Sequence, residues 1–274
     1  MAEGNILGQK VIRSHEFPLN LEIKLRNFEQ FAAIEAANLM MKDPFIHVYC
    51  MPGLAANPTI FENLSLPEER FRIHWLDWLL PKPKESLVEY AGRMCKLVKH
   101  ENPVLIGVSF GGIIVQEMAQ LIKVRRLIII SSVKTEEELP RRMKFARCTK
   151  LFKVLPTSLA RHVDSFEKLA IGDFAKKRAV LYKKYLSITD TRYLDWAIEK
   201  MVCWERKQPY RDVIHIHGDR DEIFPYKYIG DCITVPGGTH VMIINRFRWF
   251  NEHLEEIILT GRLENKKAEN EIIQ

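Results

Sequence analysis

The decisive stretch of this sequence is Val104-Leu-Ile-Gly107-Val-Ser109-Phe-Gly111-Gly112-Ile-Ile-Val115. Residues 104–108 form a short apolar run of the kind found in buried parallel strands, and the apolar residues after Ser109 recur at helical spacing. The pattern therefore predicts a strand, a sharp turn at Ser109 and a helix. Gly107 and Gly111 supply the room for that turn, because neighbouring backbone comes very close there.

A serine at such a turn lies above the carboxyl edge of a sheet, beside the free N–H groups of a helix N-terminus. This is the position of a nucleophile. The pattern G-x-S-x-G alone is weak evidence for a nucleophile, because glycine and serine are common residues. Whether Ser109 reacts therefore depends on residues further along the chain.

Length and composition indicate a soluble globular protein. The chain has 274 residues, of which 47% are hydrophobic and 28% charged, and one large domain with an insertion is the simplest division. No apolar run reaches about 18 residues, so no membrane span is predicted. The N-terminus lacks the basic start and apolar run of a signal peptide, and we expect a cytoplasmic location.

Strand and helix patterns alternate along the chain. Apolar strand-like runs cover residues 45–50, 71–75, 104–108, 126–131, 213–217 and 231–235. A capping box of Ser86 and Glu89 marks the start of one helix, and a last helix turns residues 243, 247, 250, 254 and 257 inward. We predict the α/β class, with a mostly parallel, doubly wound sheet. Within residues 1–43, the runs 11–13 and 19–25 alternate as strands do, and residues 28–41 are apolar enough for a helix or a buried connection.

The segment 134–208 differs from the rest in pattern and charge. It carries 18 lysines and arginines against 10 acidic residues, whereas the whole chain has a net charge of +6. Basic amphipathic helices, expected at 143–155 and 174–186, replace the strand pattern. We predict a helical cap at 134–208, inserted into a core formed by residues 1–133 and 209–274. No nucleic-acid motif accompanies the charge, so no nucleic-acid partner is expected.

No cofactor or metal is predicted. The five cysteines contain no C-x-x-C pair and are expected to be free thiols, and G-x-G-x-x-G and the P-loop lysine are absent. His47, His74 and His215 lie inside predicted strands, where structural histidines are more common than ligands. No cluster of histidine, cysteine and aspartate has metal-ligand spacing.

Two further motifs follow predicted strands, at 217–225 and 236–240. They place acidic residues and then His240 after the serine, which is the chain order of α/β-hydrolases. With Gly107 to Gly111, these motifs make the chain resemble an α/β-hydrolase of the small capped esterase and lyase-like type, over roughly residues 45–259. The resemblance implies a helical cap and a triad of Ser109, His240 and Asp221.

The chemistry requires these residue types. Imidazole can take the serine proton and return it to a leaving group, and a buried carboxylate fixes the imidazole tautomer. The resemblance favours Asp221 over Asp219 as that carboxylate, and Asp219 is interpreted as a turn residue. The resemblance also implies an oxyanion hole made by the backbone N–H groups of Leu54 and Phe110. Met51-Pro-Gly-Leu54 stands where the family often has His-Gly.

The leading hypothesis is a serine hydrolase that cleaves a small-molecule carboxylic ester or thioester through an acyl-enzyme. Two alternatives stay open: a C–C lyase or elimination enzyme with the same triad, and a non-catalytic binding protein on the same scaffold. We expect the cap to cover Ser109. Its basic excess either steers anionic substrates or keeps the cap soluble.

Overall fold

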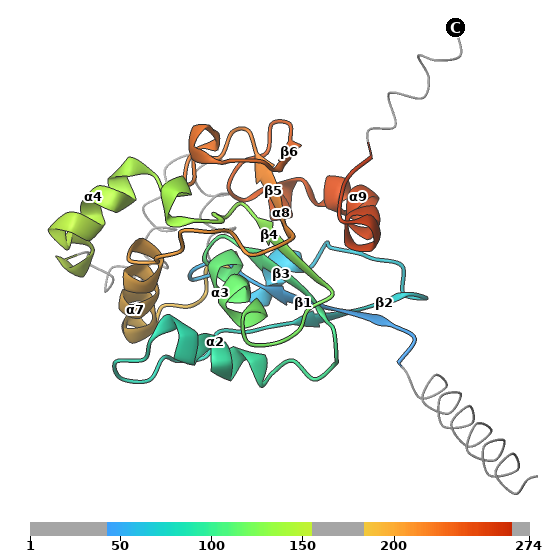
Figure 1. The fold of residues 1–274 in the computed structure, drawn as a ribbon, viewed down its shortest axis with the longest axis horizontal. Helices are drawn as coiled ribbons and strands as arrows, with labels where there is room; N and C mark the ends of the chain where they lie inside the picture. Colours follow the sequence, from blue (N-terminus) through green and yellow to red (C-terminus); the bar gives the residue numbers. More distant parts are fainter. Residues whose placement is uncertain (1–42, 155–183, 265–274) are drawn as a thin grey trace, which may run out of the picture. The chain divides into compact units, whose positions relative to one another are not determined.

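A parallel sheet of six strands forms the centre of the described structure (Figure 1). The computed structural model describes residues 43–154 and 184–264. The strands are β1 (Ile46–Met51), β2 (Phe71–Trp75), β3 (Val104–Val108), β4 (Arg126–Ile130), β5 (Val213–Gly218) and β6 (Ile233–Val235). They are arranged in the order β2-β1-β3-β4-β5-β6, and every neighbouring pair is parallel.

This order confirms the predicted fold class. The chain runs outward from β1 to β2 and then returns to β3 on the other side of β1, after which it proceeds to β6. The reversal between β1 and β3 is the topological switch point of a doubly wound sheet, and ligands bind at the carboxyl ends of the strands there. Ser109 directly follows β3 at that edge.

Helices cover both faces of the sheet. The α-helices are α2 (Leu87–Cys95), α3 (Phe110–Ala119), α4 (Arg141–Thr149), α7 (Thr191–Val202), α8 (Met242–Asn245) and α9 (Phe247–Thr260). Short 3₁₀ helices are η1 (Pro58–Phe61), η2 (Glu136–Glu138), η3 (Leu151–Val154) and η5 (Tyr226–Tyr228). All belong to one compact unit, Phe45–Gln274.

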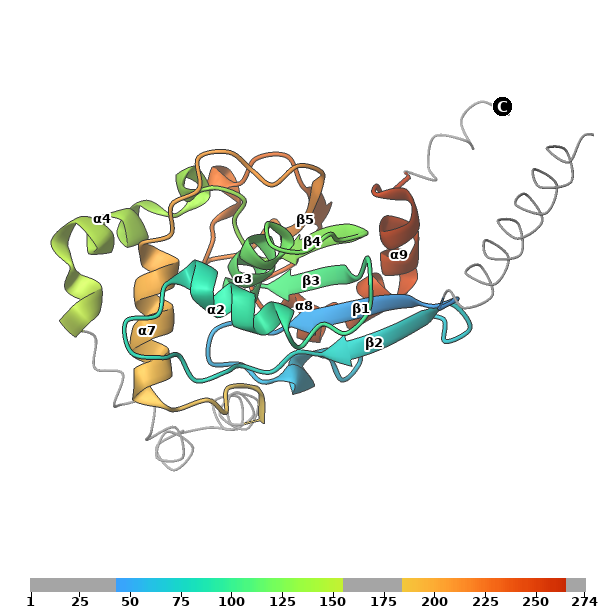
Figure 2. The ribbon, with the colours of Figure 1, turned by 60° about the horizontal axis from the view of Figure 1, so that its bottom comes forward.

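Alternating strand residues form two separate apolar cores. Val48 and Cys50 of β1 point into the core that α8 and α9 cover, and Tyr49 and Met51 point into the core that α2, α3 and α7 cover. Figure 2 shows α9 on the opposite side of the sheet from α2 and α3. Burial on both faces explains why the strands are continuously apolar rather than alternating.

The start of α2 is built as the capping box predicts. The Ser86 side chain accepts from the backbone N–H of Glu89 at 3.2 Å, and the Glu89 carboxylate accepts from the backbone N–H of Ser86 at 2.8 Å. The two side chains also share a hydrogen bond of 2.7 Å. Two donors at the helix terminus are thereby satisfied.

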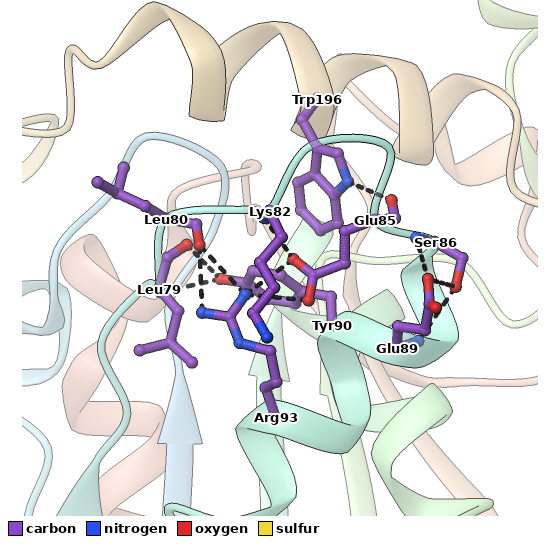
Figure 3. Close-up of polar contacts among 9 residues, drawn as sticks. All are labelled: Leu79, Leu80, Lys82, Glu85, Ser86, Glu89, Tyr90, Arg93 and Trp196. Atoms are coloured by element: carbon purple, nitrogen blue, oxygen red, sulfur yellow. Dashed lines mark hydrogen bonds and ion pairs between the residues drawn. The ribbon is translucent and has the colours of Figure 1, made fainter.

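A buried carboxylate next to this cap connects α2 to α7 (Figure 3). Glu85 is 5% exposed, and its carboxylate accepts from the Arg93 guanidinium at 2.8 and 3.0 Å and from the backbone N–H of Lys82 at 2.8 Å. The Glu85 carbonyl accepts from the indole N–H of Trp196 on α7 at 2.8 Å. The charge of Glu85 is therefore paired and hydrogen-bonded, as burial demands.

The regular elements that the structure describes between β4 and β5 are all helices. It contains η2, α4, η3 and α7, and residues 155–183 lie outside the described residues. The helix expected at 143–155 is α4 with η3, and the helix expected at 174–186 falls mostly outside. No residue of α4 is buried, whereas α7 packs Tyr193 and Ala197 into the core with α2 and α3. The cap boundaries at 134 and 208 remain a prediction.

Other expectations have mixed outcomes. The expected last helix is divided at Arg246 into α8 and α9, with Ile243, Phe250, Leu254 and Ile257 buried but Phe247 only half-buried. All five cysteines lie in described residues and are free, and of these only Cys50 is buried. The expectations for residues 1–42 lie outside the described residues. No helix of the described part is long and apolar enough to cross a membrane.

Candidate functional site

Ser109 sits at a strained turn between β3 and α3. Its backbone has φ 53° and ψ −122°, a conformation that a non-glycine residue rarely adopts. Its N–H donates to the carbonyl of Ile130 at 2.9 Å, and its carbonyl accepts from the Ser132 hydroxyl at 2.7 Å. These contacts to β4 and the residues after it hold the turn in place.

Glycines are required on both sides of Ser109. A Cβ atom at Gly107 would lie 2.4 Å from the carbonyl oxygen of Gly111, and one at Gly111 would lie 2.2 Å from the carbonyl oxygen of Pro52. Neither separation is sterically possible for a side chain. The strand, the helix and the loop after β1 therefore meet closely at this point, as the sequence pattern leads one to expect.

The imidazole of His240 bridges Ser109 and Asp221. Its Nε2 lies 3.0 Å from the Ser109 hydroxyl oxygen, and its Nδ1 lies 2.9 Å from Asp221 Oδ2. The Asp221 side chain is fully buried, and its Oδ1 accepts from the backbone N–H groups of Ile223 and Phe224 at 2.8 and 2.9 Å. The carboxylate is thus fixed in the orientation that keeps the Nδ1 proton of His240 facing it.

Asp219 lies outside this chain of contacts. It is exposed, and its Oδ1 accepts from the backbone N–H of Gly237 at 2.7 Å. That contact connects the turn after β5 to the turn after β6. Asp219 therefore occupies the turn position that the sequence analysis gave it, and the two carboxylates have separate surroundings.

Two buried histidines support the acid loop. His217 Nε2 donates to the carbonyl of Phe224 at 2.9 Å and lies 3.5 Å from Asp221 Oδ2. His217 Nδ1 then accepts from His215 Nε2 at 3.0 Å. Burial lowers the pKa of both His215 and His217 below the ordinary value for histidine. Both rings are therefore neutral, which agrees with the structural role expected of His215.

The loop after β1 reaches the other side of the serine. A Cβ atom at Gly53 would lie 3.3 Å from Ser109 Cβ, so the backbone of this loop is directly beside the hydroxyl. Phe110 is the first residue of α3, where a backbone N–H has no acceptor within its own helix. The backbone at Gly53, Leu54 and Phe110 thus lies beside the Ser109 side chain.

Trp78 is a supporting residue that sequence reasoning missed. Its indole N–H donates to the carbonyls of Gly53 and Ala56 at 3.1 and 3.0 Å, and its ring stacks on Phe110 with centroids 5.5 Å apart. Trp78 therefore fixes the loop that carries Leu54. The sequence contains no signal for this, because Trp78 belongs to an irregular stretch after β2.

An apolar cavity of about 260 Å³ opens beside Ser109 and His240. Its remaining lining is Gly53, Leu54, Ala56, Ile60, Val108, Tyr185, Leu186, Val241, Ile243, Ile244 and Asn245. None of the lining residues is an aspartate, glutamate, lysine or arginine. Such a lining suits an uncharged, mostly apolar group.

Residues 184–188 close one side of this cavity. The Tyr185 hydroxyl donates to Glu62 at 2.7 Å, the Tyr185 carbonyl accepts from the backbone N–H of Asn57 at 3.0 Å, and the backbone N–H of Ile188 donates to the Ala55 carbonyl at 3.2 Å. The chain that leads into α7 is therefore attached to the loop after β1.

Three basic residues of α4 contact nearby backbone and carboxylate oxygens. Arg142 donates to the carbonyls of Glu222 and Ile223, both at 2.7 Å, and so holds the loop next to Asp221. Lys144 donates to the carbonyl of Glu137 at 2.8 Å, and Arg147 pairs with glutamates. The basic residues Lys176, Lys177 and Arg178 of the predicted cap lie outside the described residues.

A family model described as the alpha/beta hydrolase fold matches residues 46–197, which is more than half of the chain. The chain therefore belongs to the alpha/beta hydrolase fold family, as the sequence motifs suggested. Most members of this family with similar structures are enzymes, including esterases, lactonases and epoxide hydrolases. A search of curated proteins by sequence found no match.

Solved structures of the same fold resemble the chain at low sequence identity. The enol-lactonase from Burkholderia xenovorans is 14% identical with a TM-score of 0.57, over 80% of this chain and 92% of that one. An esterase from Thermogutta terrifontis is 14% identical with a TM-score of 0.55, over 78% and 90%. Epoxide hydrolase from Vigna radiata is 12% identical with a TM-score of 0.58, over 79% and 92%. At these identities the likeness establishes the fold alone.

Proposed function

We propose that this chain is a serine hydrolase that cleaves a carboxylic ester or thioester through an acyl-enzyme on Ser109. The observation that carries the proposal is the unbroken series of contacts from Asp221 through His240 to Ser109, which ends at an apolar cavity. The fold alone would not be sufficient, because one fold supports many chemistries.

In the proposed reaction, the Ser109 hydroxyl oxygen attacks the acyl carbon while His240 Nε2 takes the hydroxyl proton. Asp221 stabilises the imidazolium that forms, and the backbone N–H groups of Leu54 and Phe110 hold the oxyanion. His240 then gives the proton to the leaving alcohol or thiol. Water attacks the acyl-enzyme by the same route and releases the acid.

The lining of the cavity supports a neutral acyl group as the part of the substrate bound there. A carboxylate or phosphate buried among Ile60, Leu186 and Ile243 would lose its hydration without gaining a charged partner. The printed names of similar structures include esterases and an enol-lactonase, and both classes of reaction cleave an acyl–oxygen bond. Ester substrates are therefore the first to test.

The decisive experiment is labelling with a fluorophosphonate followed by intact-mass analysis, together with turnover of nitrophenyl esters of increasing chain length. We expect one adduct per chain, and none in Ser109→Ala. That variant should lose about 10⁶ in kcat while its Tm stays close to that of the parent. More than a few per cent of the parent activity in folded Ser109→Ala would refute the proposal.

The other outcomes point to the alternatives. Labelling of Ser109 without turnover of any ester or thioester would favour C–C lyase or elimination chemistry. Absence of both labelling and turnover would favour a binding protein. We also propose that residues 134–208 act as a cap over Ser109, and the attachment of residues 184–188 beside the cavity supports this.

A further inference from the structure

Three histidines from separate segments meet at the β2 edge of the sheet, away from Ser109. His47 lies near the start of β1, His74 lies in β2, and His100 lies in the connection from α2 to β3. One nitrogen from each ring can be chosen so that all three atoms lie within 4.8 Å of one another. Within residues 43–154 and 184–264, this is the one such group of possible metal ligands.

The rings are in direct contact. His47 Nδ1 lies 2.7 Å from His74 Nε2, and the rings of His47 and His100 stack with centroids 3.4 Å apart and an angle of 3° between their planes. The centroids of His74 and His100 are 4.9 Å apart. Two nitrogens that face each other at 2.7 Å share one proton, and a metal ion can occupy the place of that proton.

The spacing suits a transition-metal ion. Zinc–imidazole bonds of about 2.0–2.1 Å in a tetrahedral arrangement place ligand nitrogens about 3.4 Å apart. His47 Nδ1 and His74 Nε2 are 2.7 Å apart, and the nitrogens chosen from the three rings all lie within 4.8 Å of one another. Because the planes of His47 and His100 are parallel, one of these rings has to turn before the lone pairs of all three rings point at one ion.

Tyr49 provides a second layer of contacts. Its hydroxyl lies 2.7 Å from His100 Nδ1 and accepts from the backbone N–H of Lys99 at 3.0 Å. A phenol oxygen can accept twice, so it can also take a hydrogen bond from Nδ1–H when His100 Nε2 binds a metal. Ligating histidines commonly donate their other ring N–H to such an acceptor.

We propose that His47, His74 and His100 bind one divalent transition-metal ion, of the class that prefers imidazole, such as Zn²⁺. His47 is buried, whereas His74 and His100 are half-buried. Imidazole nitrogen is a preferred ligand of such ions. His47 and His74 lie on the neighbouring strands β1 and β2, where Tyr49 pairs with His74. Because two ligands stand on paired strands, the site is rigid. The site does not depend on the proposed hydrolase activity.

The sequence analysis predicted no metal, because residues 47, 74 and 100 have no ligand spacing along the chain. Only the pairing of β1 with β2 and the turn after α2 bring them together. A sequence test for metal sites detects ligands on one helix or one loop, and it does not detect ligands collected from three elements.

The test is a titration of the full chain, first stripped with a chelator, with ZnCl₂ by calorimetry and with CoCl₂ by visible absorption. We expect one ion per chain, a tetrahedral Co²⁺ spectrum and a higher Tm with Zn²⁺. His74→Gln and His100→Gln should each lose the spectrum and weaken binding more than Tyr49→Phe, for which about a 10-fold loss is expected. Gln keeps the size of the side chain and a polar group, so these variants are expected to fold.

His253→Gln on α9 is the matched control, because it removes a half-buried histidine outside the group. It should bind Zn²⁺ as the parent does. The proposal is wrong if the parent binds no ion at micromolar Zn²⁺, or if folded His74→Gln and His100→Gln bind as tightly as the parent. Binding that is lost in His240→Gln and kept in His74→Gln would place the ion at Ser109 and would also overturn it.

Discussion

Replacement of Asp221 by asparagine tests whether Asp221 or Asp219 orients His240. In the parent, Asp221 Oδ1 accepts from two backbone N–H groups, at 2.8 and 2.9 Å, and Oδ2 faces His240 Nδ1 at 2.9 Å. An asparagine keeps its carbonyl oxygen on the two backbone donors and so turns its NH₂ group toward Nδ1. His240 must then accept at Nδ1 and carry its proton on Nε2.

That proton points at the Ser109 hydroxyl, 3.0 Å away, so the imidazole has no lone pair with which to activate the serine. We expect kcat to fall by about 10⁴. This corresponds to about 5.4 kcal/mol of lost transition-state stabilisation, at 1.36 kcal/mol for each factor of ten. The fold should persist, because the shape and the two backbone contacts of the side chain are retained.

Asp219→Asn is the matched control. Its single contact, with the backbone N–H of Gly237, needs only an oxygen, which asparagine also has. We expect less than about a twofold change in kcat, since surface changes of this kind rarely matter. Initial rates with a nitrophenyl ester, with Tm as the check on folding, decide the matter. A larger loss of kcat in Asp219→Asn than in Asp221→Asn would refute the assignment.

Three further predictions follow from local contacts. Ser86→Ala removes the side-chain half of the capping box of α2 and should lower stability by about 1 kcal/mol, or Tm by about 2–4 °C, in thermal unfolding; an unchanged Tm would contradict it. Gly53→Ala brings a methyl group 3.3 Å from Ser109 Cβ, and the resulting shift of the loop should lower kcat about tenfold with little change in Tm; a kcat equal to that of the parent would show that the loop does not position the reacting group. Because burial lowers the pKa of His215 and His217, the unfolded chain takes up protons first on acidification, so Tm should fall as pH decreases below about 6.5. The decrease of Tm between pH 7.5 and pH 5 should be smaller in His215→Asn, and an equal decrease would mean that other groups dominate.

The strands and the start of α2 could be predicted from the sequence because their signals are local. A continuous apolar run such as residues 104–108 needs burial on both faces, and the Ser86–Glu89 capping box acts within one turn. The sequence also predicted that the three residues proposed for the triad lie close together, because each follows a strand and the strand ends meet at one edge of the sheet. The structure brings Ser109, Asp221 and His240 within hydrogen-bond distance, and their catalytic roles remain a prediction.

The rest depends on contacts between distant segments. Trp78 reaches Gly53, and Trp196 reaches the carbonyl of Glu85, but neither residue has a neighbour in sequence that indicates its partner. The break between α8 and α9 at Arg246 could not be predicted, because no proline or glycine stands next to it in the sequence. The histidine group likewise arises only from strand register.

The adjacent strands β4 and β5 are joined by a long connection, which spans residues 131–212. The entropy of closing a flexible loop grows only with the logarithm of its length, so halving such a connection changes it by about 0.6 kcal/mol. Changes of length in the parts of this connection that hold no buried residue therefore cost little. In contrast, α7, with Tyr193 and Ala197 at 0% exposure, and Arg142 of α4, which contacts the loop next to Asp221, have to be kept. Evolution can thus vary the length of this connection while the sheet that positions Ser109, Asp221 and His240 stays intact.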